Sequence, residues 1–138
     1  MPDQSALVLI VENDETIREQ WAEYIGKSSF IVEQAVDLES AVRIARQLHP
    51  EVILFDMYLG IPAHPIEDLT AMRAASPSSA VVAVSGDVTL HDEALRAGAL
   101  EFIPKPVSRL SLLTDCLSAM CKKRLSDQSK RILQTNGA

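Results

Sequence analysis

The feature that most constrains the fold of this chain is a regular alternation of short apolar runs with segments whose apolar residues recur at helical spacing. Continuous apolar runs rich in β-branched residues cover residues 6–11, 52–55 and 80–84, which is typical of strands buried on both faces of a parallel sheet. Weaker strand candidates lie at residues 30–36 and 100–103. Five βα units predict an α/β protein with a doubly wound parallel sheet, right-handed crossovers and helices on both faces.

Capping and helix-breaking residues predict where the helices begin and end. Asp, Ser and Thr side chains can accept hydrogen bonds from the free N–H groups of a first turn, whereas Gly and Pro stop a helix. Thr89 with Asp92 resembles a capping box for the fourth helix. The other predicted boundaries are helix starts at Asp14, Asp37 and Ser108, helix ends at Gly26, Pro50 and Gly98, and a short third helix over about residues 66–75.

Length and composition limit the class of protein. The 138 residues suit one domain, and 47% apolar with 23% charged residues is a globular composition. No charge-free run approaches the roughly 20 residues of a membrane span, and no basic start precedes an apolar stretch, so a cytoplasmic protein is expected. The net charge of −6 argues against direct nucleic-acid binding. We expect one domain over residues 1–125 and a polar C-terminal tail over residues 126–138.

Polar residues suited to phosphoryl transfer follow four of the five predicted strands. They are Glu12 and Asn13 after the first strand, Asp56 after the third, Ser85 and Gly86 after the fourth, and Lys105 after the fifth. Carboxyl ends of parallel strands meet at one edge, so these residues should converge. Asp56 can attack a phosphoryl group, acidic neighbours can hold Mg²⁺, and Lys105 can contact a phosphoryl oxygen. The Ser85 hydroxyl can donate to another oxygen, and Gly86 leaves room for the incoming group.

Over about residues 6–120 the sequence resembles the receiver domain of two-component response regulators. The matching motifs are LVLIVEND, VILFDM, VVAVSG and FIPKP. The resemblance implies a flavodoxin-like fold with strand order 2-1-3-4-5. It also implies that Asp56 accepts a phosphoryl group from a phosphohistidine on a sensor histidine kinase or phosphotransfer protein. The Mg²⁺ ligands that it implies are Glu12, Asn13, Asp56 and the backbone carbonyl of Tyr58.

The resemblance further implies a conformational change on phosphorylation and a pair of residues that influence how long the phosphoryl group persists. Ser85 and Phe102 are expected to move together on phosphorylation and to remodel the face made by the fourth helix, the fifth strand and the fifth helix, where a downstream protein binds. Tyr58 and Asp87 should flank the path of the water that removes the phosphoryl group. Capping of the next helix is an equally open role for Asp87.

Three positions depart from the usual pattern of the family. Asn13 replaces the second acid and brings no charge, and Phe102 is a switch aromatic without a hydroxyl. The stretch at residues 60–65 lacks the usual Pro followed by Asp-Gly, so this loop should follow a different path.

Two other functions stay open at this point. The first is a pseudo-receiver that binds proteins without using phosphate, which the change at Asn13 favours and the retention of Asp56, Ser85 and Lys105 opposes. The second is a phosphatase similar to the haloacid dehalogenase superfamily. That chemistry needs a second acid two residues after the nucleophile, where this sequence has Tyr58. A nucleotide-binding fold is disfavoured, because the sequence has no GxGxxG, GKS or GKT motif.

Overall fold

Five parallel strands form one sheet in the computed structural model, which describes residues 6–122. Their order is β2-β1-β3-β4-β5, as expected for a flavodoxin-like fold. Each strand lies within one residue of its predicted run. The strands are β1 (Leu7–Val11), β2 (Ile31–Ala35), β3 (Val52–Asp56), β4 (Ala80–Ser85) and β5 (Glu101–Pro104).

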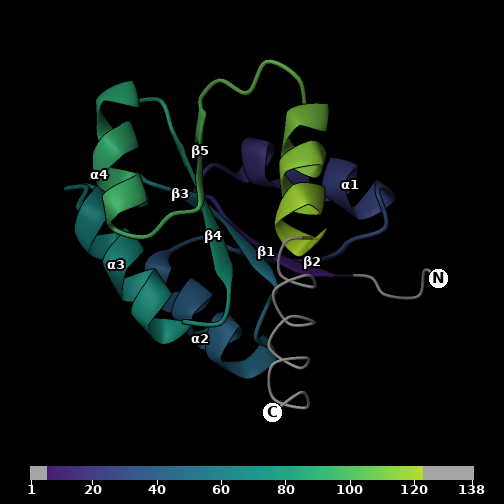
Figure 1. Ribbon diagram of the computed structural model, residues 1–138, viewed down its shortest axis with the longest axis horizontal. Helices are drawn as coiled ribbons and strands as arrows, with labels where there is room; N and C mark the ends of the chain where they lie inside the picture. Colours follow the sequence, from purple (N-terminus) through teal and green to yellow (C-terminus); the bar gives the residue numbers. More distant parts are fainter. Residues whose placement is uncertain (1–5, 123–138) are drawn as a thin grey trace, which may run out of the picture.

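Helices cover both faces of this sheet (Figure 1). α1 and the last described helix, which covers residues 111–122 and is called the C-terminal helix below, pack on one face. α2, α3 and α4 pack on the other face. The bounds are α1 (Glu15–Lys27), α2 (Leu38–Leu48), α3 (Pro65–Ala75), a 3₁₀ turn η1 (Val88–Leu90) and α4 (His91–Arg96).

The central strands are buried on both faces because their side chains alternate between two cores. In β3, Ile53 and Phe55 pack in the core beneath α2, α3 and α4, whereas Val52 and Leu54 pack in the core beneath α1 and the C-terminal helix. The alternation explains why the sequence of a central strand is apolar at nearly every position. It also means that polar residues of the central strands occur only at the strand ends, so residues that could react or bind a ligand lie at the edge of the sheet.

Two of the predicted helix caps are confirmed. The Asp14 carboxylate accepts a hydrogen bond from Ile17 N at 3.0 Å and begins α1. Asp37 begins α2 through a capping box with Ser40, whose N–H lies 2.8 Å from the Asp37 carboxylate. Each bond satisfies a backbone donor that has no partner within the helix.

The predicted starts of the last two helices are wrong. Thr89 and Asp92 form no capping box, because the Asp87 carboxylate accepts from both the backbone N–H and the hydroxyl of Thr89. This local bond begins η1 instead, and α4 starts only at His91. The C-terminal helix begins at residue 111, three residues after the predicted cap Ser108. Before it, the N–H groups of Leu112 and Leu113 donate to the carbonyl oxygens of Arg109 and Leu110, which forms a turn tighter than an α-helix.

Gly98 ends the α4 segment, as predicted, through a left-handed backbone with φ of +110°. A Cβ atom here would overlap the guanidinium of Arg73 from α3. Arg73 uses this space to reach the carbonyl oxygen of Ala97, to which Nη1 donates at 3.4 Å. Gly98 therefore serves both the backbone turn and the contact between α3 and α4.

The predicted domain boundary near residue 125 and the polar tail at residues 126–138 lie outside the described residues. Within residues 6–122, no helix is long and apolar enough to cross a membrane.

Candidate functional site

The carboxyl edge of the sheet brings together residues from four strand ends. Asp56 is the last residue of β3 and Ser85 the last of β4, while Glu12 and Lys105 directly follow β1 and β5. Backbone hydrogen bonds hold Glu12 and Lys105 in place although they lie outside the strands. Glu12 N donates to Ala35 O at 3.1 Å, and Lys105 N donates to Ser85 O at 2.9 Å. The sequence predicted this convergence from topology alone.

Asp56 is a buried carboxylate with two nitrogen neighbours. It is 3% exposed, and its Oδ1 accepts from Tyr58 N at 3.1 Å. Lys105 Nζ lies 3.6 Å from the same oxygen. Burial raises the pKa of Asp56 to about 7, and the Glu12 carboxylate adds to this rise, while the Tyr58 N–H and the Lys105 ammonium oppose it. A cation near Asp56 would therefore favour its ionised, nucleophilic form.

Lys105 connects the two acids of the edge. Its Nζ donates to Glu12 Oε1 at 2.6 Å, which is shorter than its 3.6 Å separation from Asp56 Oδ1. The other Glu12 oxygen accepts from Asp14 N at 3.0 Å. The ammonium also lies 5.7 Å from the centre of the Trp21 ring, a cation–π distance. The sequence alone does not indicate this contact between Trp21 and Lys105.

The oxygen donors at this edge suit a hard divalent cation such as Mg²⁺. Glu12 and Asp56 supply two carboxylates, whereas Asn13 is exposed and uncharged, and Asp14 is engaged as the cap of α1. Residues 6–122 hold no group of three or more His, Cys, Asp or Glu side chains arranged for a metal ion. A Mg²⁺ ion at this edge would therefore have two carboxylates, one fewer than in the usual pattern of the family that the sequence resembles.

Ser85 and Gly86 stand at the end of β4. Ser85 is fully buried, and its Oγ accepts from Asp87 N at 3.0 Å. Gly86 is exposed, and a Cβ at this position would lie 4.0 Å from the Lys105 Cβ, an ordinary contact. Its predicted role of leaving room for an incoming group stays a prediction.

Tyr58 and Asp87 are joined by a hydrogen bond, which the sequence did not indicate. The Tyr58 hydroxyl donates to Asp87 Oδ2 at 2.9 Å. This bond raises the pKa of Tyr58, while hydrogen bonds from Thr89 and then from Tyr58 lower that of Asp87. Asp87 caps η1 through Oδ1 and accepts from Tyr58 through Oδ2, and its predicted role beside the path of the attacking water stays a prediction. The loop at residues 57–64 includes a cis Ile61–Pro62 peptide, and its departure from the family's path stays a prediction.

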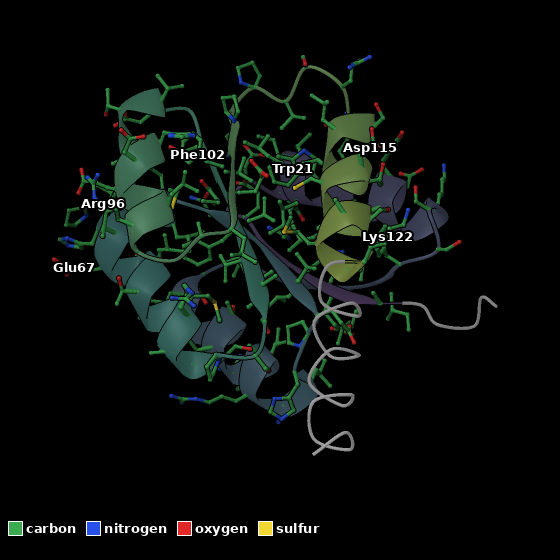
Figure 2. All side chains as sticks on the ribbon, in the orientation of Figure 1. Trp21, Glu67, Arg96, Phe102, Asp115 and Lys122 are labelled. Atoms are coloured by element: carbon green, nitrogen blue, oxygen red, sulfur yellow. The ribbon has the colours of Figure 1, made fainter. Side chains whose placement is uncertain are left out.

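Phe102 lies apart from this group of residues. It is 8% exposed and packs edge-on against His91 of α4, with 5.3 Å between the ring centres. Phe102 lies on the α4 side of β5, whereas Trp21 lies on the side of the C-terminal helix (Figure 2). In register, Phe102 pairs with Ala83, two residues before Ser85. The predicted movement of Ser85 with Phe102 would therefore be transmitted along β4 and β5.

Comparison with protein families gives a match over most of the chain. A family model described as the response regulator receiver domain matches residues 8–116. Among curated proteins, the chain is 36% identical over 104 residues to a cyclic di-GMP phosphodiesterase of Thermotoga maritima, covering 73% of this chain and 27% of that protein. It is 30% identical over 129 residues to a protein-glutamate methylesterase/protein-glutamine glutaminase of Vibrio parahaemolyticus, covering 86% and 33%. The chain thus spans a third or less of these two relatives.

Solved structures give the same fold. NtrX from Brucella abortus superposes with a TM-score of 0.76 and 27% identity, over 93% of this chain and 31% of that one. The chemotaxis protein CheY4 of Vibrio cholerae superposes with a TM-score of 0.74 and 21% identity, over 84% and 98%.

Proposed function

The chain belongs to the response regulator receiver domain family, and from this premise we propose that Asp56 is a phosphoacceptor in two-component signalling. The observation that carries the proposal is the buried Asp56 carboxylate at the end of β3, with the Lys105 ammonium 3.6 Å from Oδ1. Family membership supports a signalling role, and the position of Asp56 supports its choice as the residue that is modified.

The chemistry is a phosphoryl transfer from a phosphohistidine. An Asp56 oxygen forms a bond to phosphorus while the phosphorus–nitrogen bond of the donor breaks and its electron pair stays with the imidazole. Lys105 can neutralise one phosphoryl oxygen. The Ser85 hydroxyl accepts from Asp87 N through its oxygen, so its proton can still be donated to another phosphoryl oxygen.

Receiver domains generally bind Mg²⁺, and the residues that would hold it here are Glu12, Asn13, Asp56 and the backbone carbonyl of Tyr58. Bound Mg²⁺ supplies positive charge to the phosphoryl oxygens during transfer. The residues of the chain have separate roles. Asp56 attacks the phosphorus, and the Tyr58 N–H orients the Asp56 Oδ1. Lys105 and Ser85 bind oxygens of the phosphoryl group once it is on Asp56.

The phosphorylated edge would act on partners through the face of α4, β5 and the C-terminal helix. Contact of Ser85 with a phosphoryl oxygen would shift the end of β4, and the packing of Phe102 on His91 would carry that shift to α4. A cavity of about 250 Å³ between β5 and the C-terminal helix offers apolar contacts for a downstream protein. The donor would be a sensor histidine kinase or a phosphotransfer protein.

The fold is typical of signalling domains that are not enzymes, and we propose that the chain assists only its own phosphorylation and dephosphorylation. The activities of the phosphodiesterase and methylesterase relatives belong to those longer proteins. A phosphatase of the haloacid dehalogenase type is not supported, because Tyr58 occupies the position of its second acid and donates to Asp87. A pseudo-receiver remains the second candidate, since Asn13 is neutral and Glu12 is paired with Lys105.

Intact-mass spectrometry after incubation with acetyl phosphate and Mg²⁺ tests the proposal. We expect one phosphoryl group on the wild type and on Asp115→Asn, an exposed carboxylate of the C-terminal helix, and none on Asp56→Asn. Labelling that persists in Asp56→Asn would exclude Asp56 as the acceptor. A wild type that stays unlabelled at saturating Mg²⁺ would favour the pseudo-receiver.

A further inference from the structure

We propose that Arg18 is a positioning residue that fixes the orientation of Glu12, and that Gln34 at the end of β2 holds Arg18 in place for this task. The inference rests on the proposed function, because Glu12 enters the site through it. It gives a part in the site to β2, the one strand of the five that supplies no residue to the predicted group at the edge of the sheet.

The Arg18 side chain joins α1 to the loop that carries Glu12. Its Nη1 donates to the Glu12 carbonyl oxygen at 3.1 Å, and its Nε donates to Gln34 Oε1 at 3.2 Å. Arg18 lies in the first turn of α1, where its backbone N–H donates to Asp14 O at 2.9 Å. Side chains of a helix lean toward its N-terminus, so a residue at this position can reach back to the loop that precedes the helix.

The backbone of Glu12 is held on both sides. Glu12 is buried and directly follows Val11, the last residue of β1. Its N–H donates to Ala35 O at 3.1 Å, which ties it to the end of β2. A buried carbonyl oxygen without a donor is costly, and Arg18 supplies a donor to the carbonyl of Glu12. The two hydrogen bonds therefore restrain the backbone from which the Glu12 side chain projects.

A restrained backbone directs the Glu12 carboxylate toward the other residues of the site. Its Oε2 accepts from Asp14 N at 3.0 Å, and its Oε1 lies 2.6 Å from Lys105 Nζ. Rotation of the peptide that follows Glu12 would move the Asp14 N–H and break its bond to the carboxylate. The orientation of one acid of the site therefore depends on a hydrogen bond from Arg18, made on the side of the loop that faces β2.

The charge of Arg18 gives the proposal a sign that can be measured. Its two acceptors, a carbonyl oxygen and an amide oxygen, are neutral, so these bonds leave a positive charge beside the loop that carries Glu12. A guanidinium that acted by charge alone would oppose a divalent cation at this edge, and its removal would tighten Mg²⁺ binding. A guanidinium that acts by position has the opposite effect, because its removal releases Glu12.

Amide hydrogen exchange without metal or phosphodonor tests the position of Glu12, because the Asp14 N–H is bonded to its carboxylate. Arg18→Met keeps an unbranched side chain and removes both donors, whereas Gln34→Leu removes only the acceptor that holds Nε. We expect exchange at the Asp14 amide to be faster by about threefold to tenfold in each variant, which is the effect of losing one hydrogen bond. The double variant should add little, since both changes act through the same contact.

Matched controls separate this effect from a general loss of stability. Arg43→Met and Gln47→Leu change exposed residues of α2 and should leave exchange at Asp14 as in the wild type. Exchange in the last turn of α1 should stay unchanged in every variant. Unchanged exchange at Asp14 in Arg18→Met or in Gln34→Leu would overturn the proposal, as would faster exchange throughout α1. If Arg18→Met does not fold, Gln34→Leu decides alone, because its side chain is exposed.

Titration of amide shifts with Mg²⁺ gives the second readout, again without a phosphodonor. We expect Arg18→Met to weaken Mg²⁺ binding by about threefold to tenfold, although it removes a positive charge. Tighter binding would show that Arg18 acts by its charge, and equal binding would show that Glu12 does not need to be held; either result would overturn the proposal. A wild type that binds no Mg²⁺ would count against the proposed function, while exchange at Asp14 would still decide this inference. Neither measurement involves phosphorylation, so each can fail while labelling of Asp56 succeeds.

Discussion

The hydroxyl of Tyr58 donates to the carboxylate of Asp87 at 2.9 Å and so ties the loop after β3 to the loop after β4. Both loops lie at the edge of the sheet that carries Asp56. Tyr58 is 38% exposed, so its side chain is in part open to solvent. The expectation that these two side chains flank the path of the water that hydrolyses an acyl phosphate on Asp56 stays a prediction.

Removal of this hydrogen bond should shorten the life of the phosphorylated state. Tyr58→Phe removes the hydrogen bond to Asp87. We expect dephosphorylation to be faster by about twofold to fivefold, because the ring can then move away from Asp87. Asp87→Ala should have a similar effect, and the two should not add, since they break the same bond. Loss of phosphate followed by intact mass measures the rate, with Tyr24→Phe on α1 as the control. Unchanged rates in both variants would contradict the role of this pair.

Lys105 should be required for the response but not for the modification. Lys105→Ala removes the ammonium that would contact the phosphoryl group, so phosphorylation should persist while the change in α4, β5 and the C-terminal helix fades. Amide spectra with and without beryllofluoride and Mg²⁺ follow this change, and Lys27→Ala serves as the control. Identical perturbations in wild type and Lys105→Ala would argue against a switching role.

Restoration of the missing acid should strengthen metal binding. Asn13→Asp adds a third carboxylate charge near the proposed Mg²⁺ position, which should improve binding by about 1–2 kcal/mol at an exposed edge. Gln47→Glu on α2 adds the same charge elsewhere and should change little. Mg²⁺ titration of amide shifts decides the matter. Equal affinities for wild type and Asn13→Asp would mean that Glu12 and Asn13 are sufficient as they stand.

Ionisation of Asp56 should destabilise the metal-free fold. Its pKa is raised from 3.8 to about 7 by burial, so the native state holds this proton more tightly than the unfolded chain. The group's stabilising contribution is therefore complete below the unfolded pKa and is lost as the pH rises through the folded pKa. Asp56→Asn has no charge to bury, so its stability gain over the wild type should grow by about 2 kcal/mol between about pH 5 and pH 8.

Urea unfolding of both proteins at the two pH values, without Mg²⁺, measures this difference. A difference in stability that does not change with pH would show that Asp56 titrates in its ordinary range.

Gly98 should resist substitution for a reason that is visible in the fold. Gly98→Ala places a Cβ against the guanidinium of Arg73 on a backbone with φ of +110°. We expect a loss of about 1–3 kcal/mol of stability. Gly60→Ala is the matched control, because no atom lies within 4 Å of a Cβ there. Comparable unfolding free energies for both variants would remove the proposed constraint.

The sheet and the meeting of the site residues could be predicted from sequence because they depend on local patterns. Continuous apolar runs such as residues 52–55 mark strands buried on both faces, and parallel topology then places their polar ends together. The start of α4 was mispredicted because the choice between Asp87 and Thr89 as the cap depends on small differences between competing local hydrogen bonds.

The contacts within the site could not be read from sequence. Glu12 and Lys105 are 93 residues apart, and Tyr58 and Asp87 are 29 apart. Glu12 and Asp87 each have a local partner as well, Asp14 N and Thr89 respectively. Which distant partner each side chain meets depends on the detailed arrangement of the loops at the edge of the sheet, which the spacing of residue types does not specify.

Reduction of the phosphorylated protein with borohydride tests the central claim most directly. An aspartyl phosphate is reduced to homoserine, so peptide mass spectrometry after treatment with acetyl phosphate and Mg²⁺ locates the modified residue. We predict homoserine at position 56 alone, dependent on the phosphodonor. Reduction at Glu12 or Asp87 instead, or a phosphorylated protein with Asp56 unchanged, would contradict the claim that Asp56 is the phosphoacceptor.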